Sequence, residues 1–139
     1  MQRIVIDHEF AQPIDRIYPY LAEHENLAPV LGVSVRRVRD GDGSRNGAGS
    51  VRSLKVGPLP AFEETVTRSV PGERIEYRIT RGSPLRHHRG VMSFAPLAGG
   101  SSLHWEIEFG AGVPGLDRLV KVLLERSIRQ GLSQVDALA

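Results

Sequence analysis

The sequence predicts an α+β protein in which a curved antiparallel sheet of seven strands wraps around a long C-terminal helix and encloses a cavity. Two observations predict it. Residues 1–10 and 33–109 alternate apolar and polar side chains with the period of two of a strand, whereas from residue 116 apolar positions recur with the period of a helix. Glycine and proline turns divide the region 33–109 into short segments, and short links favour antiparallel pairing of neighbouring strands.

One strand and two short helices are expected in residues 1–32. Ile4, Ile6 and Phe10 alternate with charged residues and predict the opening strand. Pro13 suits the first turn of a helix, where its missing N–H is no loss, and apolar residues follow it at helical spacing. A second short helix is expected after Asn26, which can cap it, with Gly32 at its end.

Six further strands are expected near residues 33–39, 49–56, 61–70, 73–81, 87–95 and 101–109. The clearest turn between them is Pro71–Gly72, because proline at the second place and glycine at the third suit a type II turn.

The last element is expected to be a helix of about two dozen residues, roughly 35 Å long. Its apolar stripe consists of Leu116, Leu119, Val120, Leu123, Ile128, Leu132 and Val135. A helix is about 10 Å wide, whereas seven strands spaced about 4.8 Å apart span about 30 Å if flat. One helix cannot cover that width, so the sheet must curl around it, and any mismatch leaves a cavity.

Composition narrows the class of protein. The 139 residues are expected to form a single domain, 1–139, and the net charge is only +2. No cysteine is present, which excludes disulfides and thiolate metal sites. No segment is apolar enough for a signal peptide or a bilayer span, so we expect a cytoplasmic protein without stable membrane insertion. The densest basic region comprises Arg36, Arg37, Arg39, Arg45 and Arg52. Because no aromatic residues lie among these arginines, we expect a solvated surface there and not a nucleic-acid site.

Two charged residues fall on faces that otherwise carry apolar side chains. Arg52 shares a strand face with Leu54, and Glu64 shares one with Val66. On consecutive antiparallel strands, Arg52 and Glu64 could form an ion pair inside the cavity, where an unpaired charge would be very costly to bury. A register that turns both charges to solvent, or a purely structural pair, remains an alternative.

His87–His88 resembles a metal motif, but successive strand residues face opposite ways, so the two rings cannot readily share one ion. His88 has the parity of Met92 and Phe94 and is expected to point inward, with His87 in water. His88 is then either a hydrogen-bonding or proton-moving group of the pocket or a structural histidine.

Aromatic and sulfur-containing side chains complete the predicted ligand site. Tyr77 and Trp105 fall on inward faces, and each alone can be a plain core residue. An apolar pocket with a few polar points is typical of small-molecule sites. The predicted ligand-binding set is Arg52, Glu64, Tyr77, His88, Met92, Phe94 and Trp105, and we expect no metal and no cofactor.

The order of elements and several motifs resemble the helix-grip (SRPBCC) superfamily, which includes START domains, birch-pollen allergens and bacterial polyketide cyclase/dehydrase and lipid-transport proteins. The motifs are FAQPIDRIY at 10–18, EHENL at 23–27, GAG at 47–49 leading to Arg52, Glu64 ahead of Val66, and RIEY at 74–77. The resemblance covers essentially the whole chain. It implies the helix-grip fold and a hydrophobic ligand pocket, but not one activity.

The leading expectation is therefore binding or transport of a small hydrophobic ligand, such as a lipid, a polyketide or an isoprenoid-like compound. One alternative is a polyketide cyclase or dehydratase in which Arg52 polarises a carbonyl and His88 or Glu64 moves a proton. Another is a protein-interaction module that uses a strand edge or the basic region 36–45. The sequence is compatible with a monomer and with a homodimer.

Overall fold

The computed structural model describes residues 1–58 and 60–139 and confirms the predicted α+β architecture. Leu59, in the predicted link between two strands, lies outside the described residues. The elements, in order, are β1 (Gln2–Phe10), α1 (Ile14–Ala22), the short 3-10 turn η1 (His24–Asn26), α2 (Leu27–Leu31), β2 (Ser34–Arg39), β3 (Val51–Lys55), β4 (Phe62–Val70), β5 (Arg74–Arg81), β6 (Leu85–Leu97), β7 (Gly100–Ala111), α3 (Leu116–Leu132) and α4 (Val135–Leu138).

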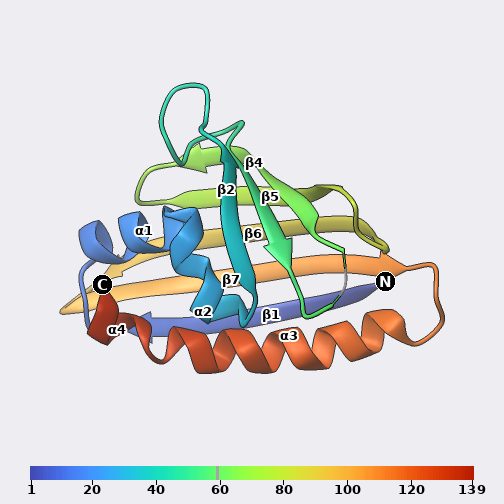
Figure 1. Ribbon diagram of the computed structural model, residues 1–139. Helices are drawn as coiled ribbons and strands as arrows, with labels where there is room; N and C mark the ends of the chain where they lie inside the picture. The colour runs from blue at the N-terminus through green and yellow to red at the C-terminus, as the bar shows by residue number, and fades with distance from the viewer. Residues whose placement is uncertain (59) are drawn as a thin grey trace.

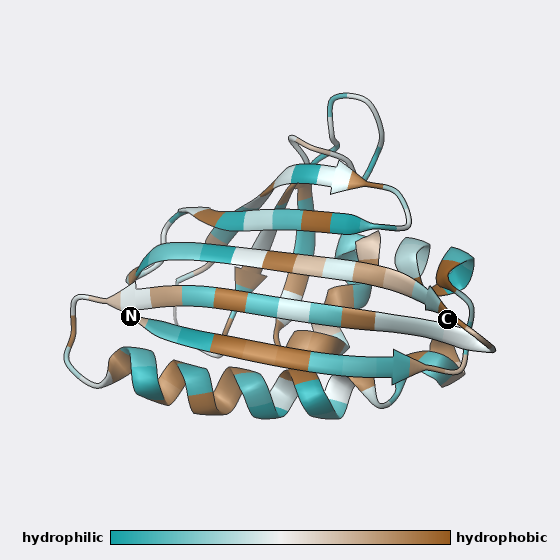
Figure 2. Ribbon diagram, turned by 180° about the vertical axis from the view of Figure 1, so that it is seen from behind, coloured by the Kyte–Doolittle hydropathy of each residue, from teal (hydrophilic) through white to brown (hydrophobic). Residues whose placement is uncertain are grey.

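The seven strands within the described residues form one antiparallel sheet with the order β1-β7-β6-β5-β4-β3-β2. Neighbours from β2 to β7 are consecutive in the chain, whereas β1 pairs with the last strand, so that Ile6 lies opposite Trp105. The sheet is strongly curved: β2 and β3 run steeply across the long strands β6 and β7, and α3 runs beside β1 (Figure 1). Hydrophilic and hydrophobic segments alternate along the strands (Figure 2), as one buried face requires.

The predicted turn and one predicted helix end are confirmed. Gly72 has a φ of 77°, and Glu73 N donates to Val70 O over 2.9 Å, which closes the turn between β4 and β5. Gly32 ends α2 with a φ of 72°. The predicted cap at Asn26 is wrong, because its side chain makes no capping bond and instead donates to Tyr20 O at 2.9 Å.

The C-terminal helix differs from the prediction in two ways. It ends at Leu132, and a turn at residues 133–134 separates it from α4. Its apolar stripe is also not buried throughout: Leu119 is 57% exposed and Leu123 54% exposed, whereas Ile128 and Leu132 are fully buried. The reason is the uneven approach of the helix to its neighbours. At Gly131 the backbones of α3 and α2 nearly touch, since a Cβ there would lie 2.4 Å from Val30 Cα.

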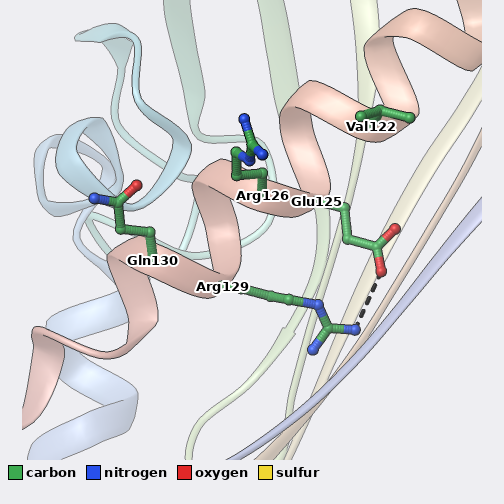
Figure 3. Close-up of a pocket in the computed structure, with 5 residues that line it drawn as sticks. All are labelled: Val122, Glu125, Arg126, Arg129 and Gln130. Atoms are coloured by element: carbon green, nitrogen blue, oxygen red, sulfur yellow. Dashed lines mark hydrogen bonds and ion pairs between the residues drawn. The ribbon is translucent and has the colours of Figure 1, made fainter.

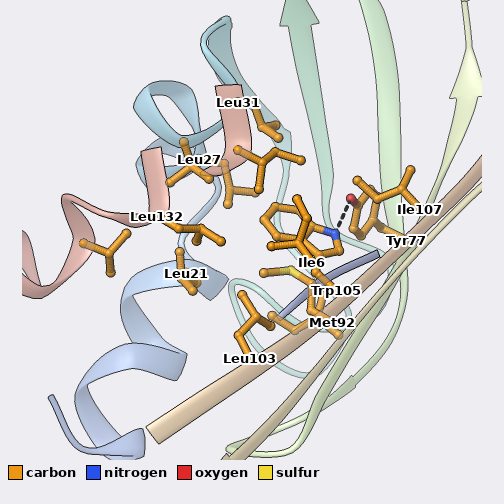
Figure 4. Close-up of a cluster of buried hydrophobic side chains, with 14 of the residues drawn as sticks. Ile6, Leu21, Leu27, Leu31, Tyr77, Met92, Leu103, Trp105, Ile107 and Leu132 are labelled. Carbon is orange, nitrogen blue, oxygen red and sulfur yellow. Dashed lines mark hydrogen bonds between the residues drawn. The ribbon is translucent and has the colours of Figure 1, made fainter. Parts of the chain in front are cut away.

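The solid part of the core surrounds this docked half of α3. Leu132 packs with Leu21, Leu27, Leu103 and Met92 in one buried cluster, drawn in Figure 4, to which α1, α2 and the sheet all contribute. The first half of α3 contributes no fully buried side chain. Between that half and the sheet the structure has room for a cavity.

Candidate functional site

The cavity has a volume of about 430 Å³ and lies between the first half of α3 and the inner face of the sheet. Strands β3 to β7, the end of α2 and the segment 82–85 complete its wall. Most of its lining is apolar, and representative residues are Leu54, Phe62, Ile79, Phe109, Val120 and Leu124. An apolar chamber of this size is typical of small-molecule sites.

A second, shallower site lies on α3 itself. It is an open depression along α3, lined by Val122, Glu125, Arg126, Arg129 and Gln130 (Figure 3). Glu125 and Arg129 form an ion pair of 3.1 Å there. All five side chains come from one helix, so the depression has no opposing wall and encloses nothing.

A buried ion pair lies at the inner end of the cavity, and one of its two residues lines the wall. Arg52 and Glu64 are directly opposite each other on β3 and β4 and are 3% and 6% exposed. The Nε and Nη2 atoms of Arg52 lie 2.9 and 2.8 Å from the same carboxylate oxygen, Oε1 of Glu64. The predicted pairing is therefore confirmed, and the solvent-facing register is excluded. Glu64 lines the cavity, but Arg52 is not among the lining residues.

His88 faces the second oxygen of this carboxylate. Its Nε2 lies 3.7 Å from Glu64 Oε2, and its Nδ1 lies 3.0 Å from the backbone N–H of Ile79. Because that N–H must donate, Nδ1 carries no proton, and the proton of the neutral ring is on Nε2, toward Glu64. Burial lowers the pKa of His88, with Glu64 raising it and Arg52 lowering it further. The ring is therefore neutral at pH 7.

The backbone around His88 explains why it points inward although β6 is irregular there. The pairing of β6 with β7 shifts its register between Arg86 and Arg89, and His87 has a φ of 54°. This bulge takes up the extra residue, His87 stays exposed, and the side chain of His88 is only 6% exposed. The predicted opposite orientation of the two rings is confirmed.

The side chain of Tyr77 lies between the Arg52–Glu64 ion pair and Trp105 of the core. The Arg52 guanidinium carbon lies 4.8 Å from the centre of its ring, and Trp105 Nε1 donates to its hydroxyl at 3.0 Å, the bond drawn in Figure 4. Burial raises the pKa of Tyr77, and Glu64 raises it further. Its cross-strand partner Gly90 makes room for the ring, since a Cβ there would lie 2.1 Å from Tyr77 Cζ.

A second buried polar group lies in η1, the turn that follows α1. His24 is fully buried, and its Nε2 lies 3.0 Å from the hydroxyl of Ser50, which itself donates to Gly47 O. His24 therefore donates from Nε2, and its Nδ1 has no partner among the described residues. Burial, followed by the charges of Arg52 and Arg37, lowers the pKa of His24 to about 3. A neutral histidine here avoids adding a second positive charge beside Arg52.

The region 36–45, expected to be solvated, is partly an ordered cluster of charges. The side chain of Arg37 is only 12% exposed, lies 2.6 Å from Glu23, and also binds Glu25 and Asn46. Arg45 reaches the same Glu23 at 2.9 Å. The expectation is wrong for Arg37 because η1 packs against β2 and brings Glu25, together with Glu23 just before it, to this side chain. It is also wrong for Arg52, which is buried.

The structure divides the predicted ligand residues into two groups. Glu64, Tyr77 and His88 line the cavity together. Met92, Phe94 and Trp105 point inward as expected but are buried in the core and are not among the lining residues. Arg52 belongs with this second group and reaches the cavity only through Glu64 and Tyr77. Their roles in ligand binding stay predictions.

Much of the cavity wall was not predicted from the sequence. Phe62, Ile79 and Phe109 have the same inward parity as the predicted residues but were not selected, while Val120 and Leu124 lie on α3. Strand parity could have identified the first three. It could not show which part of each strand faces the undocked half of the helix.

Two further findings concern other kinds of site. Within residues 1–58 and 60–139, no group of three or more His, Cys, Asp or Glu side chains is placed to hold a metal ion. None of the helices described is both long and apolar enough to cross a membrane.

Comparison with known proteins agrees with this geometry. The chain matches the family described as polyketide cyclase/dehydrase and lipid transport over residues 1–139. No curated protein sequence matches it.

Solved structures similar to this one share its fold at low sequence identity. A START superfamily protein from Mycobacterium smegmatis is 14% identical with a TM-score of 0.77, covering 97% of this chain and 94% of that chain. The Zhui aromatase/cyclase from Streptomyces sp. R1128 is 18% identical with a TM-score of 0.70, covering 98% and 89%. Truncated norcoclaurine synthase from Thalictrum flavum is 13% identical with a TM-score of 0.68, covering 96% and 92%. With a helix-grip fold and a family match along its whole length, the chain belongs to the polyketide cyclase/dehydrase and lipid transport family.

Proposed function

We propose that this protein binds a small hydrophobic molecule in the cavity beneath α3 and acts as a carrier for it, as one cytoplasmic domain comprising residues 1–139. The observation that supports this most is the cavity itself, about 430 Å³ with a mainly apolar wall and three polar groups gathered at its inner end. At about 25 cal/mol per Å², burial of roughly 300 Å² of ligand surface contributes about 7 kcal/mol before entropy costs. That is enough for useful binding without any chemical step.

The test uses two variants of the same helix. Val120 lines the cavity, whereas Val122, two residues away on α3, is 63% exposed and lines the outer depression. We expect Val120→Trp to fill the chamber and abolish binding of the neutral fluorophore N-phenyl-1-naphthylamine, while Val122→Trp leaves its affinity unchanged. Equal affinities in both variants, or no binding to the wild-type protein, would contradict the proposal.

Native mass spectrometry of the purified protein provides an independent measurement. We expect a co-purifying apolar molecule that is lost in Val120→Trp and kept in Val122→Trp. A protein that is always empty and binds no apolar probe would favour the interaction-module alternative.

One observation favours an enzymatic role as a second candidate. His88 Nε2, which carries the ring proton, and Glu64 Oε2 are 3.7 Å apart at the end of the cavity, where they could act as acid and base on a bound polyketone. If so, turnover of a linear polyketone should be lost in His88→Phe while the fluorophore still binds. Turnover that survives this substitution would remove His88 from the mechanism.

A further inference from the structure

At the inner end of the cavity, one donor and one acceptor face each other and neither has a hydrogen-bond partner among the described residues. Both hydrogen bonds from Arg52 go to Oε1 of Glu64, and no hydrogen bond to Oε2 is found in the described part of the chain. His88 uses Nδ1 to accept from Ile79, which leaves its Nε2 proton free. The two atoms lie 3.7 Å apart, too far for a direct hydrogen bond.

A single hydroxyl group fits this gap. It can accept from His88 Nε2 and donate to Glu64 Oε2 at the same time, because a hydroxyl has one proton and two lone pairs. A carbonyl or ether oxygen can accept from His88 but cannot donate to Glu64. A carboxylate has no proton to donate, and a carboxylate or a phosphate places a negative charge beside that of Glu64.

The charges around the cavity strengthen this selection. Among the described residues that line it, Glu64 is the single acidic residue, and no lysine or arginine is present. The countercharge, Arg52, lies behind Glu64 with its guanidinium over the ring of Tyr77. A bound anion would lie next to the Glu64 carboxylate. It would lose its hydration without gaining a cationic partner, and this desolvation is unfavourable.

We propose that the cavity selects neutral ligands that carry a hydroxyl group, such as alcohols, phenols or enols, and discriminates against carboxylates and phosphates of the same apolar shape. This rests on the proposed function, since it assumes that the chamber holds a ligand. Glu64 is the specificity-determining residue, His88 supplies the second hydrogen bond, and Arg52 positions Glu64. A volume of about 430 Å³, that of about fourteen water molecules, fits a compact ring system and not a long diacyl lipid.

Three naphthalene derivatives test the proposal with the wild-type protein at pH 7.5, each titrated as a competitor of bound N-phenyl-1-naphthylamine. We expect 2-naphthol to bind at least about tenfold more tightly than 2-methylnaphthalene, because a hydrogen bond to a charged group has that effect or more. We expect 2-naphthoate to bind at least about tenfold more weakly than 2-methylnaphthalene. Naphthoate that binds as well as naphthol would overturn the proposal.

Paired substitutions locate the selection. Glu64→Gln alone leaves the buried charge of Arg52 without a partner and can unfold the protein. The test therefore combines Arg52→Met with Glu64→Leu, which replaces the pair by apolar side chains. In this double variant the advantage of 2-naphthol should fall below about threefold. The matched control is Arg3→Met with Glu106→Leu, which removes an exposed ion pair of 2.7 Å between β1 and β7. The control should keep the full preference, and a preference that also survives in the cavity variant would refute the role of Glu64.

The outcomes separate the two proposals. If neither the fluorophore nor any naphthalene binds, the proposed function fails and the selection fails with it. If the fluorophore and 2-methylnaphthalene bind and are excluded by Val120→Trp, but 2-naphthol has no advantage, the carrier function stands and only the selection is overturned.

Discussion

Removing one partner of the Arg52–Glu64 pair should destabilise the protein far more than removing both. With charge centres about 4 Å apart and an effective dielectric constant of about 20, the attraction is about 4 kcal/mol. The remaining charge would have to stay in a site that is 3% or 6% exposed. We therefore expect Arg52→Met and Glu64→Leu each to lower the free energy of unfolding by about 3–5 kcal/mol, and the double variant to stay within about 1 kcal/mol of the wild type.

Urea unfolding followed by far-UV circular dichroism measures these free energies, and a double-mutant cycle gives the coupling between the two positions. By thermal unfolding, each single variant should lose roughly 10–20 °C in Tm. The control is again Arg3 and Glu106, whose side chains are 57% and 32% exposed and whose pair should contribute about 0–1 kcal/mol. If the buried single variants cost no more than this surface pair, the interior is wetter than the structure implies and the reasoning is wrong.

Two further substitutions test the surroundings of the pair. Gly90→Ala places a methyl group 2.1 Å from Tyr77 Cζ, so it should lower the free energy of unfolding in urea by about 1–3 kcal/mol and weaken fluorophore binding. An unchanged free energy of unfolding would mean that the Tyr77 ring moves freely. His24, with its pKa lowered to about 3, stays neutral in the folded protein while the unfolded chain takes up a proton below about pH 6.5. The free energy of unfolding should therefore fall as the pH is lowered from about 6.5 to 3. His24→Gln keeps a donor for Ser50 but removes this titration. Between pH 7 and 4 its free energy of unfolding should therefore fall by about 3 kcal/mol less than that of the wild type. Parallel stability curves for the two proteins would refute this.

The orientation of the key side chains was predictable because it depends on a local property. Successive strand residues face opposite sides, so the inward positions of Arg52, Glu64 and Tyr77 follow from the sequence once the strands are located. The pairing of Arg52 with Glu64 needed one more step, a short link between consecutive strands, and the register of β3 and β4 confirms it.

The position of the cavity along the strands was not predictable in this way. Trp105 and Phe109 share one face of β7, yet Trp105 is buried in the core and Phe109 lines the cavity. The difference arises from α3, which is docked near Gly131 and stands off near Val120, and that tilt depends on contacts with α2 far away in the sequence.

By itself the sequence determined the order of the elements, the curved antiparallel sheet and the inward face of each strand, because periodicity and turn residues act over a few neighbours. Only the tertiary structure decided that Glu64 faces the chamber while Arg52 stands behind it, and that the free proton of His88 is on Nε2. Those facts depend on groups brought together from different strands, such as the backbone N–H of Ile79 on β5 beside a histidine of β6. No local sequence pattern predicts such a contact, because each residue could pair with many others until the curved sheet has formed.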